Sequence, residues 1–481
     1  MVLNTEVGNI ESQRHSQGKI IYDPLYGFIH LTPLEWKVVQ TPFFQRLRWI
    51  KQLGFSSYVF PSAEHSRFGH SIGAMHNADK ILASIGKAVS FDKLCQNEIK
   101  DEAAIFHRDV RLGALLHDIG SFAFSHTIEE AYIKFDSSQK GLKREKAHHE
   151  TLGAKIILNS EMEGGLTKLF KESHVDPKKI ASLVKGDSSS LLANQILHSE
   201  IDCDRMDYLL RDAYFTGLKY GSYDRDYLIY HMMTQKVGNE EVLTINVNAL
   251  QSVEDFLTSR FNWYSQVIRS PRGAKYDALA ERIAYMLLEQ NLLITFDELL
   301  DQVENSPEKF YGFNDQYYMT TLHRLYTEGK LKHLPVLENM VSCLLFTRGI
   351  ESLEVEGFEH RLLEQNDENN IKKWIKKSES KATEVKQNLT EIGGPSDWVI
   401  VDYPKKSIAL IKSSQKVKKD GELLNVFHSR DAAKILDRDG RVRLLADFEN
   451  STISKLSNIA NFTPNLFCSA GFYKKYMDKQ N

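Results

Sequence analysis

The chain has 481 residues, of which 42% are hydrophobic and 26% charged, with 27 glycines and 11 prolines. This composition excludes collagen-like, low-complexity and wholly disordered chains, and the length suffices for two or three domains with a sizeable core. Lysine and arginine total 61 against 64 aspartate and glutamate, a net charge of −3. The chain therefore has no overall basic field that would attract nucleic acid, and we expect no nucleic-acid partner.

Cysteine usage and hydropathy indicate a reducing, aqueous location. The N-terminal residues 1–13 are polar and acidic, and no apolar run approaches the roughly 20 residues that cross a bilayer. We expect a soluble cytoplasmic protein with no membrane partner. The four cysteines are far apart and lack a CxxC spacing, which indicates neither a disulfide framework nor a thiolate zinc site: Cys95, Cys203, Cys343 and Cys468.

Helical spacing dominates the chain from Leu34 to about Gln290. Apolar residues there recur at helical intervals, as in 79–85 and 110–116, and few stretches alternate. Short extended pieces interrupt the pattern at Gly18–Ile21 and at Glu241–Asn246, where EVLTIN is typical of a strand. The sequence therefore predicts a mainly α fold.

The C-terminal part has a different pattern. Residues 366–387 form a charged and then polar stretch, which indicates a solvated helix or connector rather than a basic binding patch. After Gly393-Gly394-Pro395, the segments DWVIVDY, SIALIKS and RVRLLADF are typical of short strands, and RDAAKIL is typical of a helix. We predict a core over residues 1–365, a charged connector over 366–394 and a small α+β domain over 395–481.

An adjacent histidine and aspartate end one apolar helical run. In GALLHDIGSFAFSH, His117 and Asp118 follow the run, which Gly120 can end in a left-handed cap. Each group costs several kcal/mol if it is buried without a partner, so the pair needs protein partners or a metal ion. A capped and solvated helix end is the alternative for this dipeptide alone.

Two further segments carry polar residues on helices. In SAEHSRFGHSIGAMHNADKI, His70 lies just inside a helix that Ser66 can cap. In SEIDCDRMDYLLRDAY, one helix face carries four polar residues, and a solvated surface face is the alternative: Asp204, Tyr208, Arg211 and Asp212.

Two imidazoles and two carboxylates from three helices form the candidate metal site. Such a mixed nitrogen and oxygen set suits iron, manganese, zinc or magnesium better than calcium, and it leaves positions for water and a phosphate. These ligands are His70, His117, Asp118 and Asp204.

The sequence resembles the HD-domain superfamily, within it the deoxynucleoside triphosphate triphosphohydrolases related to the vertebrate sterile-alpha-motif/HD enzyme, without the sterile alpha motif. The resemblance covers about two thirds of the chain and thins out toward the C-terminal appendage. It runs through DPLYGFIHL, TPFFQRLRWIKQLG, YVFPSAEHSRFGHSIG, LLHDIGSFAFSH, HHETLG and IDCDRMDYLLRDAYFTG. It implies an HD-domain helical core, to which the small C-terminal α+β appendage is added.

The resemblance also implies a catalytic cluster and a cofactor. The four candidate ligands match the family's metal ligands, which implies one divalent transition metal (Fe, Mn or Zn), with Mg²⁺ accompanying the nucleotide as a further option. His126, Glu129 and His149 match the residues that protonate the leaving oxygen while water attacks the α-phosphate. His126 and Glu129 are i, i+3 on a helix begun near Ser125, so the carboxylate can orient the imidazole.

Six residues match the family's substrate pocket. Arg67 resembles the phosphate-contacting arginine, although an arginine of this kind also commonly sits in a surface ion pair. Gln52 and Leu53 resemble the residues that read the sugar edge. The pocket on the deoxyribose 3′ side is matched by Tyr208, Asp212 and Tyr264, of which Tyr264 in RFNWYSQV is alternatively part of a core aromatic stripe.

Two departures from the family pattern bear on activity. Ser121 stands where active relatives have a second histidine, and a serine supplies no cationic donor to the α-phosphate. Lys19, Gln45 and Arg48 match a nucleotide-activator site at a subunit interface, but Gln40 stands where a guanine-reading aspartate is found, and Gln cannot reproduce its two hydrogen bonds. A different activator, or none, fits equally well.

The implied function is metal-dependent hydrolysis of deoxynucleoside triphosphates to deoxynucleoside and inorganic triphosphate, by a homo-oligomer (dimer or tetramer). Two alternatives stay open. One is an HD-type phosphohydrolase that acts on nucleoside monophosphates or phosphodiesters, and the other is a catalytically weakened nucleotide-sensing regulatory protein.

Overall fold

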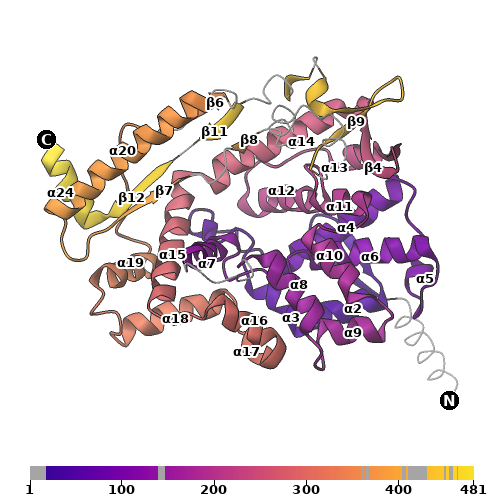
Figure 1. Cartoon of the computed structure of the whole chain (residues 1–481), viewed down its shortest axis with the longest axis horizontal. Coiled ribbons are helices and arrows are strands. Elements are labelled where there is room, and N and C mark those ends of the chain that lie inside the picture. The colour runs from indigo at the N-terminus through magenta and orange to yellow at the C-terminus, as the bar shows by residue number, and fades with distance from the viewer. Residues whose placement is uncertain are drawn as a thin grey trace.

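The computed structural model describes residues 18–138, 147–359, 361–364, 368–403, 408–409, 431–448, 451–453, 459–462 and 464–480. Helices dominate these residues, and short strands join them mainly near the two ends of the chain (Figure 1). This confirms the predicted mainly α fold with small sheets. Among the described helices, none is both long and apolar enough to span a bilayer.

The first helices build the part of the molecule that holds the candidate site. They are α2 (Pro33–Gln40), α3 (Pro42–Gln45), α4 (Arg67–Ser84), α5 (Phe91–Leu94), α6 (Glu102–Leu116), α7 (His126–Ser138), α8 (His149–Asn159), α9 (Leu166–Glu172), α10 (Pro177–Lys185), α11 (Leu191–His198), α12 (Cys203–Thr216) and α13 (Arg225–Tyr230).

Most of the later helices lie toward the left or the bottom of the molecule in Figure 1, whereas α14 packs beside α12 and α13. They are α14 (Leu250–Trp263), α15 (Pro271–Glu289), α16 (Phe296–Asn305), α17 (Pro307–Tyr311), α18 (Asp315–Thr327), α19 (Pro335–Leu345), α20 (Glu368–Ile392) and α24 (Ala470–Gln480).

Within the part of the chain that the structure describes, the strands form four small sheets. β1 pairs with β2, the order β10-β9-β4-β3 makes a second sheet, and β11 and β12 are each the middle strand of a three-stranded sheet, β6-β11-β8 and β5-β12-β7. Their bounds are β1 (Lys19–Asp23), β2 (Gly27–Leu31), β3 (Met232–Val237), β4 (Glu240–Asn246), β5 (Ile350–Ser352), β6 (Arg361–Glu364), β7 (Val399–Asp402), β8 (Ile408–Ala409), β9 (Lys434–Leu436), β10 (Val442–Leu444), β11 (Ile459–Phe462) and β12 (Asn465–Ser469).

Close packing of α4 between α6 and α12 brings the predicted motifs together. Gly73 makes this approach possible, since a Cβ at that position would lie 1.8 Å from Asp207 Oδ1 and 2.5 Å from Arg211 Nη2. Arg211 is buried, so the polar face predicted for α12 is an interior face and the alternative of a solvated surface face is wrong.

The C-terminal residues add a second, smaller core. The helix α20 lies along β6 and β7 (Figure 1), so of the solvated helix or connector expected over residues 366–387 a helix is found, but it is not fully solvated because Val385 is buried. The side chains of this core are Leu353, Val385, Leu466, Cys468, Phe472 and Tyr476. The domain limits at residues 365 and 394 stay predictions.

Several local predictions are wrong. RDAAKIL contains strand β9 instead of a helix, because Ile435 is fully buried and pairs in parallel with Ile245 of β4. RVRLLADF is a strand only at Val442–Leu444 and then a 3-10 helix. By contrast, the described part of SIALIKS, Ile408–Ala409, is a strand as predicted, and the rest of that segment lies outside the described residues.

The predicted helix ends also differ in detail. Gly120 is not in the left-handed region, and α6 ends at Leu116. Gly120 is needed for close packing instead, because a Cβ there would lie 2.2 Å from the His149 carbonyl oxygen. Ser66 precedes α4 as predicted, but its side chain makes no capping hydrogen bond.

Candidate metal centre and active site

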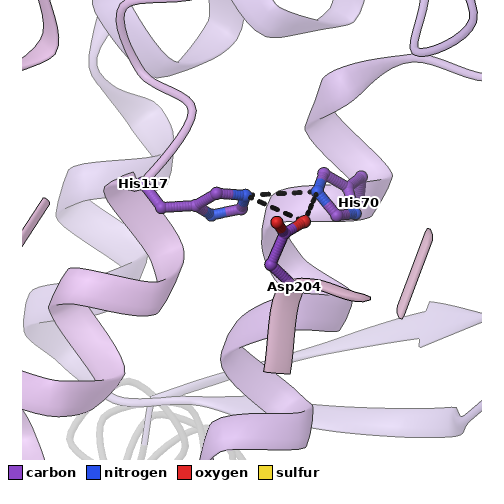
Figure 2. A group of neighbouring side chains, drawn as sticks. All are labelled: His70, His117 and Asp204. Atoms are coloured by element: carbon purple, nitrogen blue, oxygen red, sulfur yellow. Dashed lines mark hydrogen bonds and ion pairs between the residues drawn. The ribbon is translucent and has the colours of Figure 1, made fainter. Parts of the chain in front are cut away.

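Three helices bring two imidazoles and a carboxylate to one point. His70 comes from α4, His117 follows the last residue of α6, and Asp204 lies in the first turn of α12; the three side chains point toward one another in Figure 2. His70 Nε2 is 3.2 Å from His117 Nε2 and 3.0 Å from Asp204 Oδ1, and His117 Nε2 is 3.6 Å from Asp204 Oδ1. Their ligand atoms all lie within 4.8 Å of one another.

The second nitrogen of each imidazole already has a partner. His70 Nδ1–H donates to Asp207 Oδ2 at 2.8 Å, and His117 Nδ1–H donates to the carbonyl oxygen of Ala114 at 2.8 Å. In the neutral rings, both Nε2 atoms then present lone pairs to each other at 3.2 Å, which is repulsive unless a proton or cation lies between them. Ligand atoms each about 2 Å from one ion are spaced in this way. The donor set therefore fits a divalent metal ion.

Asp118 lies at the edge of this cluster. Its Oδ2 is 3.5 Å from His70 Nε2 and 3.4 Å from His117 Nε2, and it also forms an ion pair with Arg67 Nη1. Burial alone would raise the pKa of Asp118, but the charges of Arg67 and His117 hold it well below its ordinary value. Asp118 is therefore an anion, and Arg67 is oriented beside the four predicted ligands, all of which the fold brings together.

A second histidine cluster is built on the first turns of α7 and α8. Glu129 accepts from His126 Nδ1–H at 2.7 Å through Oε2 and from His149 Nδ1–H at 2.8 Å through Oε1. Burial acts to raise the pKa of Glu129, but the two imidazoles hold it well below its ordinary value. Burial acts to lower the pKa of His149, and the Glu129 charge outweighs it, so this pKa is raised. The three predicted catalytic residues therefore form one contact group.

The predicted sugar-reading residues lie in a buried polar region. Gln52 N–H donates to the His65 carbonyl oxygen at 3.0 Å, and His65 Nε2–H donates to Asp212 Oδ1 at 2.7 Å. Gln52 Oε1, His65 Nδ1 and Asp212 Oδ2 are buried and make no hydrogen bond in the structure. Leu53, which follows Gln52 in the sequence, is buried in the main hydrophobic core. Unpaired buried polar atoms of this kind are costly unless a ligand satisfies them.

The ring of Trp263 links Tyr208 to Tyr264. The ring of Trp263 lies 4.9 Å from that of Tyr208, and Trp263 in turn contacts Tyr264 at 4.8 Å. Tyr264 begins a π-helical turn, Tyr264–Ile268, between α14 and α15. A π-turn of this kind frequently marks a functional site. Tyr208 and Tyr264 thus lie in one aromatic group.

Only some of the residues predicted to bind a nucleotide activator lie close to one another. Arg48 Nε–H donates to Gln45 Oε1 at 2.8 Å, and the Arg48 guanidinium lies 3.5 Å from the centre of the Phe68 ring. Lys19 is on β1, where its Nζ lies 5.8 Å from the Trp36 ring centre. Among the described residues, no direct contact joins Lys19 to this pair. Gln40 is exposed at the end of α2.

Two residues that orient the site were missed from sequence. Asp207 fixes the His70 ring, and it could have been found because it lies i+3 from Asp204 on the same helix turn. His65 holds Asp212 across 147 positions of sequence, and no local pattern points to that contact. Ser121 is buried, and its carbonyl oxygen accepts from Arg46 Nη2 at 2.9 Å.

Three helices thus position a candidate metal site, and comparison of the sequence with protein families indicates the class of domain. Residues 67–212 match the HD domain family model. These residues are therefore similar to an HD domain, and the resemblance to the HD-domain superfamily predicted from sequence is confirmed.

Relatives at the sequence level include characterised and uncharacterised proteins. An uncharacterized protein of Bacillus subtilis is 31% identical over 56% of this chain and 56% of its own length. The deoxynucleoside triphosphate triphosphohydrolase SAMHD1 homolog of Dictyostelium discoideum is 33% identical over 41% of this chain and 37% of its own length, and human SAMHD1 is 28% identical over 54% and 43%. The matched part thus spans about half, or less, of these curated relatives.

Two solved structures share the fold over nearly the whole chain. A hypothetical protein from Aquifex aeolicus has a TM-score of 0.66 and 23% identity and covers 96% of this chain and 100% of its own. A phosphohydrolase from Bacteroides thetaiotaomicron has a TM-score of 0.62 and 22% identity and covers 94% and 99%.

Proposed function

We propose that the chain is a metal-dependent phosphohydrolase that cleaves deoxynucleoside triphosphates into deoxynucleoside and inorganic triphosphate. The observation that carries the proposal is the facing pair of Nε2 atoms of His70 and His117 beside Asp204, with both Nδ1 atoms already engaged. The similarity to deoxynucleoside triphosphate triphosphohydrolases supports the substrate class. In this proposal, His70, His117, Asp118 and Asp204 hold one iron, manganese or zinc ion, and magnesium accompanies the nucleotide.

The protein's own cations would bind and orient the triphosphate. When bound, the metal ion supplies a Lewis acid for phosphate oxygens and lowers the pKa of a water molecule. Arg67 is held by Asp118 and by Ser125 Oγ, which accepts from its Nε–H at 2.9 Å. A guanidinium that is fixed on two sides is suited to contact phosphate oxygens without further loss of side-chain freedom.

The second histidine cluster would supply the proton. Water loses a proton as it adds to the α-phosphorus, the bond from phosphorus to the 5′ oxygen breaks, and this oxygen takes a proton from His126 or His149. The proton lost by the water replaces the one that the imidazole donates. Glu129 binds the Nδ1 side of both rings, so each Nε2 is directed away from it and is available for this transfer.

The pocket for the nucleoside would lie around the unpaired polar atoms of Gln52 and Asp212. A hydroxyl of the deoxyribose can satisfy such atoms, and Leu53, Tyr208 and Tyr264 are the remaining predicted contacts. We further expect a cytoplasmic homo-oligomer, in which Lys19, Gln45 and Arg48 contact a nucleotide activator.

One observation favours a second candidate. Ser121 supplies no cation to the α-phosphate, so the site is also compatible with hydrolysis of a nucleoside monophosphate or phosphodiester, or with nucleotide binding without turnover.

Product analysis distinguishes these functions. Protein loaded separately with iron, manganese or zinc is incubated with each of the four deoxynucleoside triphosphates, and nucleoside and phosphate products are separated. Deoxynucleoside with inorganic triphosphate is the expected result. Monophosphate with pyrophosphate would reassign the cleaved bond, and orthophosphate released only from monophosphates would support the second candidate. Bound nucleotide and metal without any product would identify a sensor.

A further inference from the structure

The residues before His126 have an unusual backbone. Phe124 and Ser125 have φ values of 49° and 56°, in the left-handed region that non-glycine residues rarely occupy. They lie directly before the first residue of α7, so their conformation sets the direction in which the His126 side chain points. Two consecutive residues in this region persist only where the surrounding structure holds them.

A buried carboxylate from a distant helix holds this turn. Asp315, the first residue of α18, accepts from Phe124 N–H at 2.6 Å through Oδ1 and from Lys51 N–H at 2.9 Å through Oδ2. It therefore joins two segments that are far apart in sequence. One of these leads into His126, and the other leads into Gln52.

The same two segments are joined again at Ser125. Its Oγ–H donates to the Lys51 carbonyl oxygen at 2.6 Å, and Oγ accepts from Arg67 Nε–H at 2.9 Å. The contacts thus run without a break from Asp315 through the turn to the guanidinium beside Asp118.

Arg46 joins the loop between α6 and α7 to the start of α18. It is buried, and its guanidinium donates to the carbonyl oxygens of Ile119 at 3.0 Å and Ser121 at 2.9 Å, and to that of Phe313 at 2.7 Å. Phe313 lies two residues before Asp315. The loop between α6 and α7 is therefore fixed to the start of α18 at both of its ends.

From these contacts we propose that Asp315 is a positioning residue of the active site, which holds the left-handed turn at Phe124 and Ser125 so that His126 and Arg67 keep their relative placement. Asp315 lies outside the matched HD domain and touches none of the candidate metal ligands in the contacts described. Its role in turnover rests on the proposed function.

The test compares D315N, S125A and the control D397N. An asparagine at 315 keeps one oxygen acceptor but presents an amide NH₂ to the other backbone N–H. Asp397 is also a buried carboxylate that accepts a backbone N–H, from Gly394 at 2.7 Å, but it lies in the C-terminal core. S125A removes the step between the turn and Arg67 and leaves the Asp315 contacts in place.

We expect kcat to fall roughly 10- to 100-fold in D315N and S125A, as misplacement of a catalytic group does, while KM and bound metal stay near wild type. D397N should keep the wild-type kcat. Unchanged kcat in both D315N and S125A, or loss of metal together with kcat, would overturn the proposal.

A readout without turnover separates this proposal from the proposed function. Amide hydrogen exchange in D315N should become faster only in the peptides that contain Lys51 and residues 118–127. If wild-type protein hydrolyses no deoxynucleotide, the proposed function fails, and this exchange pattern still decides the role of Asp315. Faster exchange spread over the whole chain would show that Asp315 only stabilises the fold, and the proposal would be wrong.

Discussion

The two histidine clusters within residues 67–212 are built by different means. In the metal cluster, His70 is fully buried, His117 is 11% exposed, and each ring is fixed by a hydrogen bond on the side away from the centre. In the second cluster, His126 is 67% exposed, and one carboxylate, Glu129, serves both rings. One cluster rests on the packing of three helices, and the other on a loop turn and two helix starts.

This difference fits two chemical tasks. A resident metal ion requires ligand atoms that are already in place before the ion binds, since ordering them later would lower the affinity. A proton donor must instead meet a substrate that arrives and leaves, so one of its imidazoles has to face solvent. We therefore expect substitutions in the first cluster to change metal content and substitutions in the second to change turnover alone.

The largest effect is expected for D204N. A neutral amide replaces the anionic ligand, and the loss of a bound metal removes several kcal/mol of stabilisation of the transition state. Activity should fall at least about a thousandfold, and metal analysis should find much less than one ion per chain. The control D224N changes the aspartate that caps α13, and it should keep both metal and activity. A D204N protein with full metal content would disprove the assignment.

A smaller effect is expected for H126N. Loss of a general acid lowers kcat roughly 10²- to 10⁴-fold, while metal content stays at the wild-type level. Steady-state kinetics and metal analysis of the same preparation measure both. The control is H148N, because His148 is adjacent to the cluster and caps α8, and asparagine is also a good capping residue. If H126N protein lost its metal, the two clusters would not be separate in function.

A still smaller effect is expected for D207N, which weakens the support of one ligand. Asp207 accepts from His70 Nδ1–H and so keeps the Nε2 lone pair directed at the metal position. Loss of such a partner lowers metal affinity about 10- to 100-fold. Competition with a chelator should show this, and kcat at saturating metal should stay close to wild type. Equal chelator sensitivity of D207N and wild type would show that helix packing alone orients His70.

Much of the metal cluster could be predicted from sequence because its residues lie on, or directly after, three regular helices. The HD dipeptide follows an apolar helical run, and Asp204 lies in the first turn of another helix, so motif and periodicity point to the same residues. The second cluster was predicted from the family pattern, and the spacing of His126 and Glu129 agrees with it. The mainly α fold was also predicted from the helical periodicity of the apolar residues.

What sequence could not predict depends on contacts between distant segments. Asp315 is 191 positions from Phe124, and Ile435 becomes a strand residue only because it pairs with β4. Neither contact leaves a local signal, and local propensity around RDAAKIL even favours a helix. Gly120 shows the same limit, since the amino-acid sequence alone does not distinguish a glycine that packs closely against α8 from one that caps a helix.

The last prediction concerns pH and the support of the second cluster by Asp277, which accepts from Thr127 Oγ1–H at 2.8 Å and from Phe55 N–H at 3.2 Å. Burial raises the pKa of Asp277 from 3.8 to about 6. The folded protein therefore binds this proton more tightly than the unfolded chain, so the contribution to stability is complete below about pH 4 and is lost as pH rises through about 6.

Relative to D277N, the wild-type free energy of unfolding should decrease by roughly 1–3 kcal/mol over that interval, at about 1.4 kcal/mol per unit of pKa difference. Urea unfolding of both proteins across this pH range measures the difference, in which the other titrating groups cancel. If the free energies of unfolding of wild type and D277N changed in parallel with pH, the Asp277 carboxyl would titrate alike in the folded and unfolded states. If metal affinity changed over the same pH range, the metal cluster and the second cluster would share the support of Asp277.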